Sequence, residues 1–151
     1  MATRSNIAYR TPEGKIRSIY CHWDGYPAHN GEMLVRYYQE ARKIAQLTEL
    51  GSLSYLRMNV FPSTDSAHSF ETPQEDVCVY YGRDRGETGQ ETREYEDIPS
   101  WIDDMEEYAY LWNGREWLVN DHGERDSNGF PVFSRVEDVI TEEQRKMVGW
   151  E

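Results

Sequence analysis

The sequence predicts an α+β fold, a single domain over residues 1–151 with a mainly antiparallel sheet of about five strands and two principal helices. Three observations lead to this prediction. Short strand-like segments are joined by local turn sequences, which is typical of antiparallel sheets. Two segments carry helix signals, one of them with apolar residues at helical spacing. The length of 151 residues suits one core, which buries roughly 70% of the surface exposed by the unfolded chain.

The N-terminal part predicts two strands, residues 7–10 and 16–23, joined by a tight turn. Residues 11–14 carry proline at the second position and glycine at the fourth, which suits a type I turn in a hairpin. Alternation along the second strand places Ile19 and Cys21 on one face, where Cys21 is expected as a small core residue.

The middle of the chain predicts a long helix, an irregular segment and a further strand. Asn30 is expected to cap a helix over about residues 31–50, with Gly51 as its terminator. Residues 52–76 lack sustained periodicity and predict a long loop, and residues 77–81 predict a strand. A loop of that length within a compact domain often carries function.

The strongest local signal is a hairpin over residues 108–119. Asn113-Gly114 is the most favoured two-residue hairpin turn, and it pairs Tyr110 with Trp117. Both faces of this hairpin are apolar, so it is expected near the centre of the sheet.

The remaining C-terminal segments predict less regular structure and two helices. Residues 83–97 are charged and predict a surface loop, and residues 99–105 predict a short helix. Ser134 and Glu137 match a capping box, which predicts a C-terminal helix interrupted near Thr141.

The composition limits the classes of function. The chain has a net charge of −12, so direct binding of nucleic acid, which needs clustered Lys and Arg, is not expected. No segment is long and apolar enough to span a membrane, and the N-terminus shows no secretory signal. The only two cysteines, Cys21 and Cys78, are therefore expected as reduced thiols in a cytosolic protein.

The segment 20–31 concentrates polar and aromatic residues where a strand leads into a helix. His22 and Asp24 at a strand end are half of a two-histidine, one-carboxylate iron site, whose third ligand would come from His29, His68 or His122. The competing interpretation is a structural corner, with the turn made by Asp24-Gly25. The three-residue pattern is weak, so the corner is favoured, and neither a metal nor a cofactor is predicted.

A cysteine–histidine nucleophile is not favoured either. Cys21 and His22 are adjacent in a strand and face opposite sides, so His22 cannot serve as the base for Cys21. The sequence therefore favours a protein without enzymatic activity.

A second candidate site is the turn around Arg83 and Arg85, which offers two guanidinium groups to a phosphate or carboxylate. In the competing interpretation these arginines pair with neighbouring acids in a solvated loop. Together with the corner, the turn would line a pocket for a small or nucleotide-like ligand. The ligand-binding or partner-binding candidates are His22, Trp23, Asp24, Tyr26, His29, Asn30, Arg83, Asp84 and Arg85.

The segment 87–107 holds nine carboxylates and one arginine, Arg93, a net charge of −8. One interpretation is an unneutralised acidic face that binds a partner and resembles a phosphate array; the other is a solubilising surface. The residues of this acidic partner-binding face are Glu91, Glu94, Glu96, Asp97, Asp103, Asp104, Glu106 and Glu107.

Three motifs resemble one family of small, mostly uncharacterised proteins of bacteriophages and prophages. They are the start Met1-Ala2-Thr3-Arg4-Ser5-Asn6-Ile7, the segment YCHWDGY with HNG over 20–31, and YGRDRGE over 81–87. The resemblance covers about the first two thirds of the chain and implies no established activity. It implies a phage protein in the host cytoplasm.

These observations favour a small acidic phage accessory protein that binds and modulates or inhibits a host protein. Host takeover or counter-defence is the expected role, with a nucleic-acid-binding enzyme or defence complex as partner and nucleic-acid mimicry as one mode. The alternatives are a small-molecule or nucleotide-binding protein, or an enzyme, centred on residues 22–30 and 83–85, and a structural component of the virion.

Overall fold

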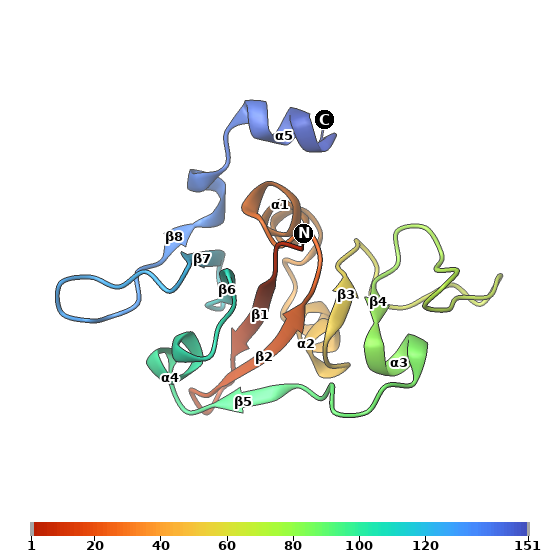
Figure 1. Ribbon diagram of the computed structural model, residues 1–151, viewed down its shortest axis with the longest axis horizontal. Helices are drawn as coiled ribbons and strands as arrows, with labels where there is room; N and C mark the ends of the chain where they lie inside the picture. The colour runs from red at the N-terminus through yellow and green to blue at the C-terminus, as the bar shows by residue number, and fades with distance from the viewer. Residues whose placement is uncertain (1, 151) are drawn as a thin grey trace.

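The computed structural model describes residues 2–150 and has an α+β architecture built on one open, mixed sheet (Figure 1). The eight strands are β1 (Ser5–Arg10), β2 (Ile16–Cys21), β3 (Leu53–Tyr55), β4 (Val79–Tyr80), β5 (Arg93–Tyr95), β6 (Tyr108–Trp112), β7 (Trp117–Asp121) and β8 (Ser134–Arg135). The α-helices are α1 (Glu32–Tyr37), α2 (Ala41–Glu49), α3 (Tyr81–Arg85), α4 (Ile98–Asp103) and α5 (Glu142–Val148). A π-helical turn, η1 (Pro27–Gly31), precedes α1, and a 3₁₀ turn, η2 (Val136–Val139), follows β8.

The sheet has the strand order β4-β3-β2-β1-β6-β7-β8, and β5 pairs with β2 off this path. Most neighbours are antiparallel, but β1 pairs in parallel with β6, and β2 pairs in parallel with β3. The α+β class is confirmed. The expected sheet of about five antiparallel strands is only roughly right, because long connections bring β3 and β6 alongside the first hairpin in parallel.

The sheet is buried on both faces. On one face α1 and α2 cover a large apolar cluster that includes Ile7, Ile19 and Tyr110. On the other face α4 covers a smaller cluster in which Trp101 is fully buried. The Trp101 indole N–H donates to the Ser18 hydroxyl at 2.9 Å and so ties α4 to β2.

The predicted helix over 31–50 is two helices that meet at a break. Tyr38 leaves helical geometry with φ −126° and ψ 71°, and its fully buried hydroxyl end donates to the Arg57 carbonyl at 2.6 Å. Asn30 does not cap a helix, since it lies inside η1. Gly51 does follow the helical segment, with φ +87°, a value that favours glycine.

The hairpin of β6 and β7 forms as predicted, but its register differs by two residues. Trp112 rather than Tyr110 pairs with Trp117. The Asn113 side-chain oxygen accepts hydrogen bonds from the backbone N–H groups of Arg115 and Glu116, both at 2.9 Å. This local turn makes the loop longer than the two residues that Asn-Gly predicts.

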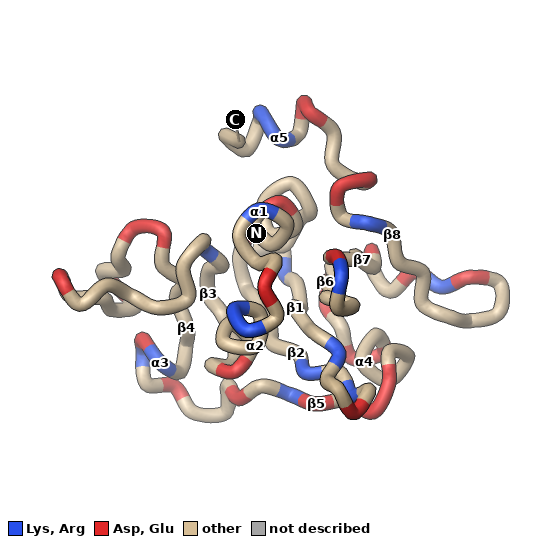
Figure 2. The backbone as a smooth tube through the Cα atoms, turned by 180° about the vertical axis from the view of Figure 1, so that it is seen from behind, with Lys and Arg blue, Asp and Glu red and all other residues tan. Residues whose placement is uncertain are grey.

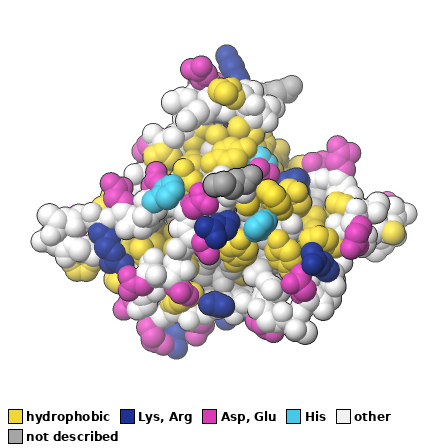
Figure 3. All heavy atoms as spheres, in the orientation of Figure 1, with side chains coloured by type: hydrophobic (Ala, Val, Ile, Leu, Met, Phe, Trp, Pro, Cys, Tyr) yellow, Lys and Arg dark blue, Asp and Glu magenta, His cyan; other side chains and the backbone are white. Residues whose placement is uncertain are grey.

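The C-terminal helix begins at a later residue than predicted. Ser134 forms a strand with β7, and the capping box is made by Thr141 and Gln144, which confirms the expected interruption near Thr141. Near the C-terminus, the Trp150 indole N–H donates to the Ala28 carbonyl of η1 at 2.7 Å, and the Arg36 guanidinium of α1 lies over its ring. Figure 3 shows hydrophobic side chains gathered beneath this C-terminal segment.

Within residues 2–150, no helix combines the length and the apolar character that crossing a membrane requires.

Candidate functional site

The corner after β2 is a tight structural turn. Asp24 has φ +59°, and the Gly25 N–H donates to the Thr3 carbonyl at 2.8 Å. A Cβ at Gly25 would lie 2.8 Å from the carbonyl carbon of Arg4, so a side chain there would clash with backbone. The structural interpretation of Asp24-Gly25 is therefore confirmed.

His22 and Trp23 make contacts within the same corner. The His22 ring Nδ1 lies 2.7 Å from the Tyr20 hydroxyl, and the Trp23 indole stacks on Tyr55 with centroids 6.1 Å apart. Across residues 2–150, no three His, Cys, Asp or Glu side chains group in a way that could hold a metal ion.

Asn30 holds the corner to the sheet from inside. Its fully buried amide donates to the Trp23 carbonyl at 3.2 Å and the Ser5 hydroxyl at 3.3 Å, and lies 3.4 Å from the Cys21 sulfur. Burial raises the pKa of the Cys21 thiol to about 12. The thiol is therefore neutral and unsuited to nucleophilic chemistry.

Tyr26 and His29 face the C-terminal end of the chain. Their rings lie 6.1 Å apart, and the His29 ring lies 6.5 Å from the Trp150 ring. The His29 Nδ1 also lies 2.9 Å from the side-chain oxygen of Asn30. These two residues thus join the corner to the C-terminal segment.

Arg83 uses its guanidinium to fasten the irregular segment 56–78 to α3. It donates to the Val60 carbonyl at 2.6 Å and the Cys78 carbonyl at 2.8 Å, and it pairs with Asp84 at 2.8 Å. Arg85 lies over the Phe70 ring, 4.7 Å from its centroid. The Arg83 donors are therefore directed at the protein itself.

Asp84 is the buried centre of this network, with a side chain only 4% exposed. Its carboxylate accepts the Tyr80 backbone N–H at 2.8 Å and lies 3.2 Å from the His68 Nε2. Burial alone would raise the pKa of Asp84, but the hydrogen bonds from Arg83, Tyr80 and His68 outweigh it and hold that pKa below its usual value. The charged form is stabilised by three donors.

The two candidate loops do not come together as expected. Cys21 and Tyr80, the last residues of β2 and β4, both pair with Leu53, but the chain leaves the two strands in opposite directions because β2 and β3 are parallel and β3 and β4 are antiparallel. Figure 1 shows α3 below β4 and α1 above the sheet. A nucleotide-like pocket formed jointly by residues 22–30 and 83–85 is therefore not supported by their placement.

The acidic segment is not unneutralised, which corrects the expectation for that face. Figure 2 shows basic positions interleaved with the acidic ones along β5 and beside α4. Asp97 instead caps α4, accepting the Ser100 N–H at 2.9 Å. The ion pairs are Arg85 with Glu87, Lys15 with Glu94 and Glu96, Arg17 with Glu94, Arg93 with Asp104, Arg125 with Asp103, and Arg4 with Glu106 and Glu107. In the described part of the chain, Glu91 has no ion-pair partner.

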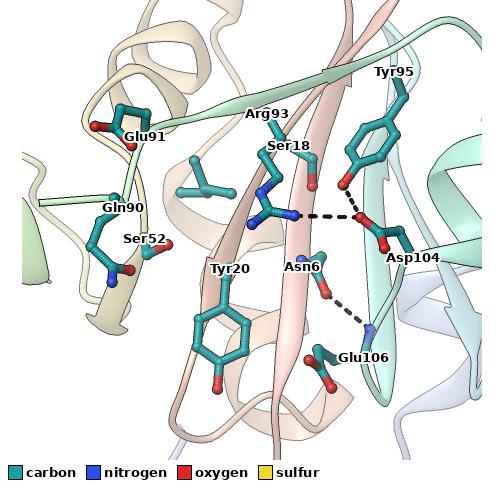
Figure 4. Close-up of a pocket in the computed structure, with 12 residues that line it drawn as sticks. Asn6, Ser18, Tyr20, Ser52, Gln90, Glu91, Arg93, Tyr95, Asp104 and Glu106 are labelled. Atoms are coloured by element: carbon teal, nitrogen blue, oxygen red, sulfur yellow. Dashed lines mark hydrogen bonds and ion pairs between the residues drawn. The ribbon is translucent and has the colours of Figure 1, made fainter.

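A polar cleft of about 320 Å³ lies between this segment and the sheet (Figure 4). Its floor comes from β1 and β2, on the face that α4 covers further along. Its walls come from the segment before β5, from β5 itself and from the residues after α4. The lining residues are Asn6, Ser18, Ile19, Tyr20, Ser52, Gly89, Gln90, Glu91, Arg93, Tyr95, Asp104 and Glu106.

Two buried polar side chains in the cleft have unused hydrogen-bonding groups. Asn6 is 8% exposed; its Oδ1 accepts the Glu106 N–H at 3.1 Å, while its Nδ2 has no partner within residues 2–150. Ser52 is 9% exposed, and its hydroxyl likewise makes no hydrogen bond to that part of the protein. Figure 4 shows the Asn6 Nδ2 and the Ser52 hydroxyl pointing into the open space.

The cleft is acidic and keeps its phenols protonated. Three carboxylates line it against the single cation of Arg93. Burial, together with the nearby charge of Glu106, raises the pKa of Tyr20 to about 12. Burial and the hydrogen bond to Asp104, at 2.6 Å, also raise the pKa of Tyr95.

Sequence reasoning included three residues of this cleft, Glu91, Asp104 and Glu106, among the acidic face, but it missed Asn6 and Ser52. The available signal was weak. Asn6 directly precedes the predicted first strand, and Ser52 follows the predicted helix terminator, and neither position alone indicates a site.

Comparisons with known proteins do not place the chain in a family: no family model, curated protein or solved structure matches it.

Proposed function

We propose that the protein is a binding protein without catalytic activity, and that it recognises a partner protein through the cleft and the acidic segment 87–107. The resemblance to phage proteins makes a host protein the expected partner, bound so as to modulate or inhibit it. The observation that carries this proposal is the acidic cleft, in which buried hydrogen-bonding groups are left unused.

The charge of the segment supports a protein partner with a basic surface. Five basic residues from outside the segment pair with it, which reduces its net charge from −8 to −3. These pairs are exposed, so they neutralise the surface only in part. The remaining negative potential favours fast encounter with a basic partner and weakens as salt rises.

The alternative, a nucleotide site built on Arg83, has less support. The Arg83 guanidinium already donates to two backbone carbonyls and to Asp84. A phosphate at this position would have to displace those hydrogen bonds and release the segment 56–78.

The test is affinity capture from a host lysate at low and high salt, followed by titration of the captured protein in purified form. The variant Glu91→Lys/Glu106→Lys reverses two carboxylates of the cleft. The matched control, Glu71→Lys/Glu75→Lys, makes the same change of charge in an exposed loop on another part of the surface.

We expect the wild type and the control to bind the same partner, with affinity that falls as salt rises, and the cleft variant to lose it. Equal binding by the two variants, or no specific partner at either salt concentration, would contradict the proposal.

A further inference from the structure

The cleft combines two kinds of hydrogen-bonding group. Glu106 and the unused amide donor of Asn6 lie together on one wall, where the Glu106 backbone N–H donates to Asn6, and Glu91 lies with the Ser52 hydroxyl on the opposite wall (Figure 4). A ligand that satisfies both kinds of group must carry several donors and, beside them, a carbonyl-like acceptor. This requirement narrows the chemistry of the occupant.

The carboxylates select a cation. Asp104 is held by Arg93 and Tyr95, so Glu91 and Glu106 are the acids with most capacity for a ligand. Glu106 shares only an exposed ion pair at 3.3 Å with Arg4. Three carboxylates against one arginine repel an anionic ligand, including a phosphate.

The aromatic wall favours a guanidinium over an ammonium ion. Tyr20 lines the cleft beside Glu106, and its ring offers a face for a planar cation. A guanidinium stacks on such faces and can bind carboxylates through two parallel N–H groups, whereas an ammonium is a compact point charge.

The amide donor of Asn6 calls for an oxygen acceptor near the cation. Asn6 and Tyr20 are cross-strand partners in β1 and β2, so the donor and the aromatic wall are neighbours on the cleft floor. A peptide carbonyl is an acceptor of the required kind, and it accompanies every arginine residue in a protein.

We infer that the cleft binds an arginine side chain of the partner protein. The guanidinium lies against Glu106 and Tyr20, attracted also by Glu91 on the opposite wall, and a carbonyl of the same peptide accepts from the Asn6 amide. The volume of about 320 Å³ is at the small end of the range for ligand pockets and suits one side chain with part of its backbone. This inference rests on the proposed function, because the arginine is supplied by the bound protein.

The experiment uses a small probe that does not depend on knowing the partner. N-acetyl-L-arginine N-methylamide is titrated into the ¹⁵N-labelled full-length protein and followed by NMR. We expect saturable shifts at the cleft, including the side-chain amide of Asn6. The citrulline counterpart has the same shape without the charge, and we expect it to bind at least about tenfold more weakly.

Two variants identify the groups responsible. Glu91→Gln removes one carboxylate of the cleft that has no ion pair in the described residues, so it is expected to fold and to bind the arginine probe several-fold more weakly. Glu71→Gln is the matched control and should bind like the wild type. The lysine counterpart of the probe should bind more weakly than arginine.

The inference is overturned if the arginine probe gives no saturable shifts at the cleft, or if the citrulline or lysine probe binds equally well. A partner that is captured and lost on reversing Glu91 and Glu106, while the arginine probe fails to bind, would reject this inference and leave the proposed function standing. Binding of the probe without any captured partner would reject the proposed function instead.

Discussion

Replacing Asp84 with asparagine tests whether the arginine-rich turn has a structural role. The Asp84 side chain is 4% exposed and accepts from Arg83 and the Tyr80 backbone at 2.8 Å, and from His68 at 3.2 Å. Asparagine retains one oxygen but places an NH₂ group against these donors. Breaking a buried ion pair costs about 3–5 kcal/mol. The Arg83 side chain is 20% exposed, so water solvates its charge in the variant and reduces this cost. We therefore expect a loss of about 2–3 kcal/mol in the free energy of unfolding.

Urea unfolding followed by tryptophan fluorescence measures this loss. With a slope of about 2 kcal/mol per molar urea, the midpoint should fall by roughly 1 M. Asp103→Asn is the matched control, because Asp103 pairs with Arg125 while 74% exposed. Its loss should stay below about 1 kcal/mol. If both variants unfolded at the same urea concentration, the Arg83 network would not be holding the fold, and a functional role for the turn would regain support.

Two further predictions concern the cleft wall and acid stability. Gly51→Ala should lower the free energy of unfolding by about 1–3 kcal/mol in the same urea assay, because the new Cβ would lie 2.1 Å from the Gln90 carbonyl oxygen and Gly51 has φ +87°; unchanged stability would contradict this. Burial acts to raise the pKa of Glu32, but the Arg36 and Arg145 guanidinium groups, at 2.6 and 2.8 Å, outweigh it and lower that pKa. The stability from this depressed pKa is present above the unfolded-state value and is lost as pH falls through the folded-state value. Glu32→Gln should therefore lose less stability than the wild type between neutral pH and about pH 3, and an equal loss would contradict the assignment.

Local signals in the sequence predicted the elements that depend on near neighbours. The turn over 11–14 forms with the Gly14 N–H donating to the Thr11 carbonyl at 2.8 Å, and α4 falls within one or two residues of the predicted short helix. The β6–β7 hairpin is also local and was predicted, although a side-chain oxygen, that of Asn113, set its register.

The parallel pairings could not be predicted in the same way. The contact of β1 with β6 joins residues about a hundred positions apart, and no turn sequence encodes it. The capping box at Ser134 failed for a related reason, since pairing with β7 satisfies that backbone and overrides the local helix signal. Tertiary context decided both cases.

In the candidate site, too, the sequence shows the residues themselves but not the distant residues that contact them. The acidic residues were visible in the sequence, but their partners were not, because Arg4 and Arg125 lie far from them along the chain. The motif residues Asn30 and Arg83 were predicted as candidates for binding a ligand or partner. Their hydrogen bonds are directed at the protein's own backbone and account for them as structural residues.

The position of the cleft follows from how β2 is paired. Its outer edge is shared by β3 at Cys21 and by β5 at Ile16–Ser18, which leaves a gap between these two neighbours. Over Ser18 the face is closed by Trp101, but beyond it the cross-strand pair of Asn6 and Tyr20 is polar. The same face therefore changes from an apolar core beneath α4 to a polar floor where no helix covers it among the described residues. The Asn6 amide and the Ser52 hydroxyl open onto the cleft rather than being sealed in the core, so these groups are available to hydrogen-bond a polar ligand.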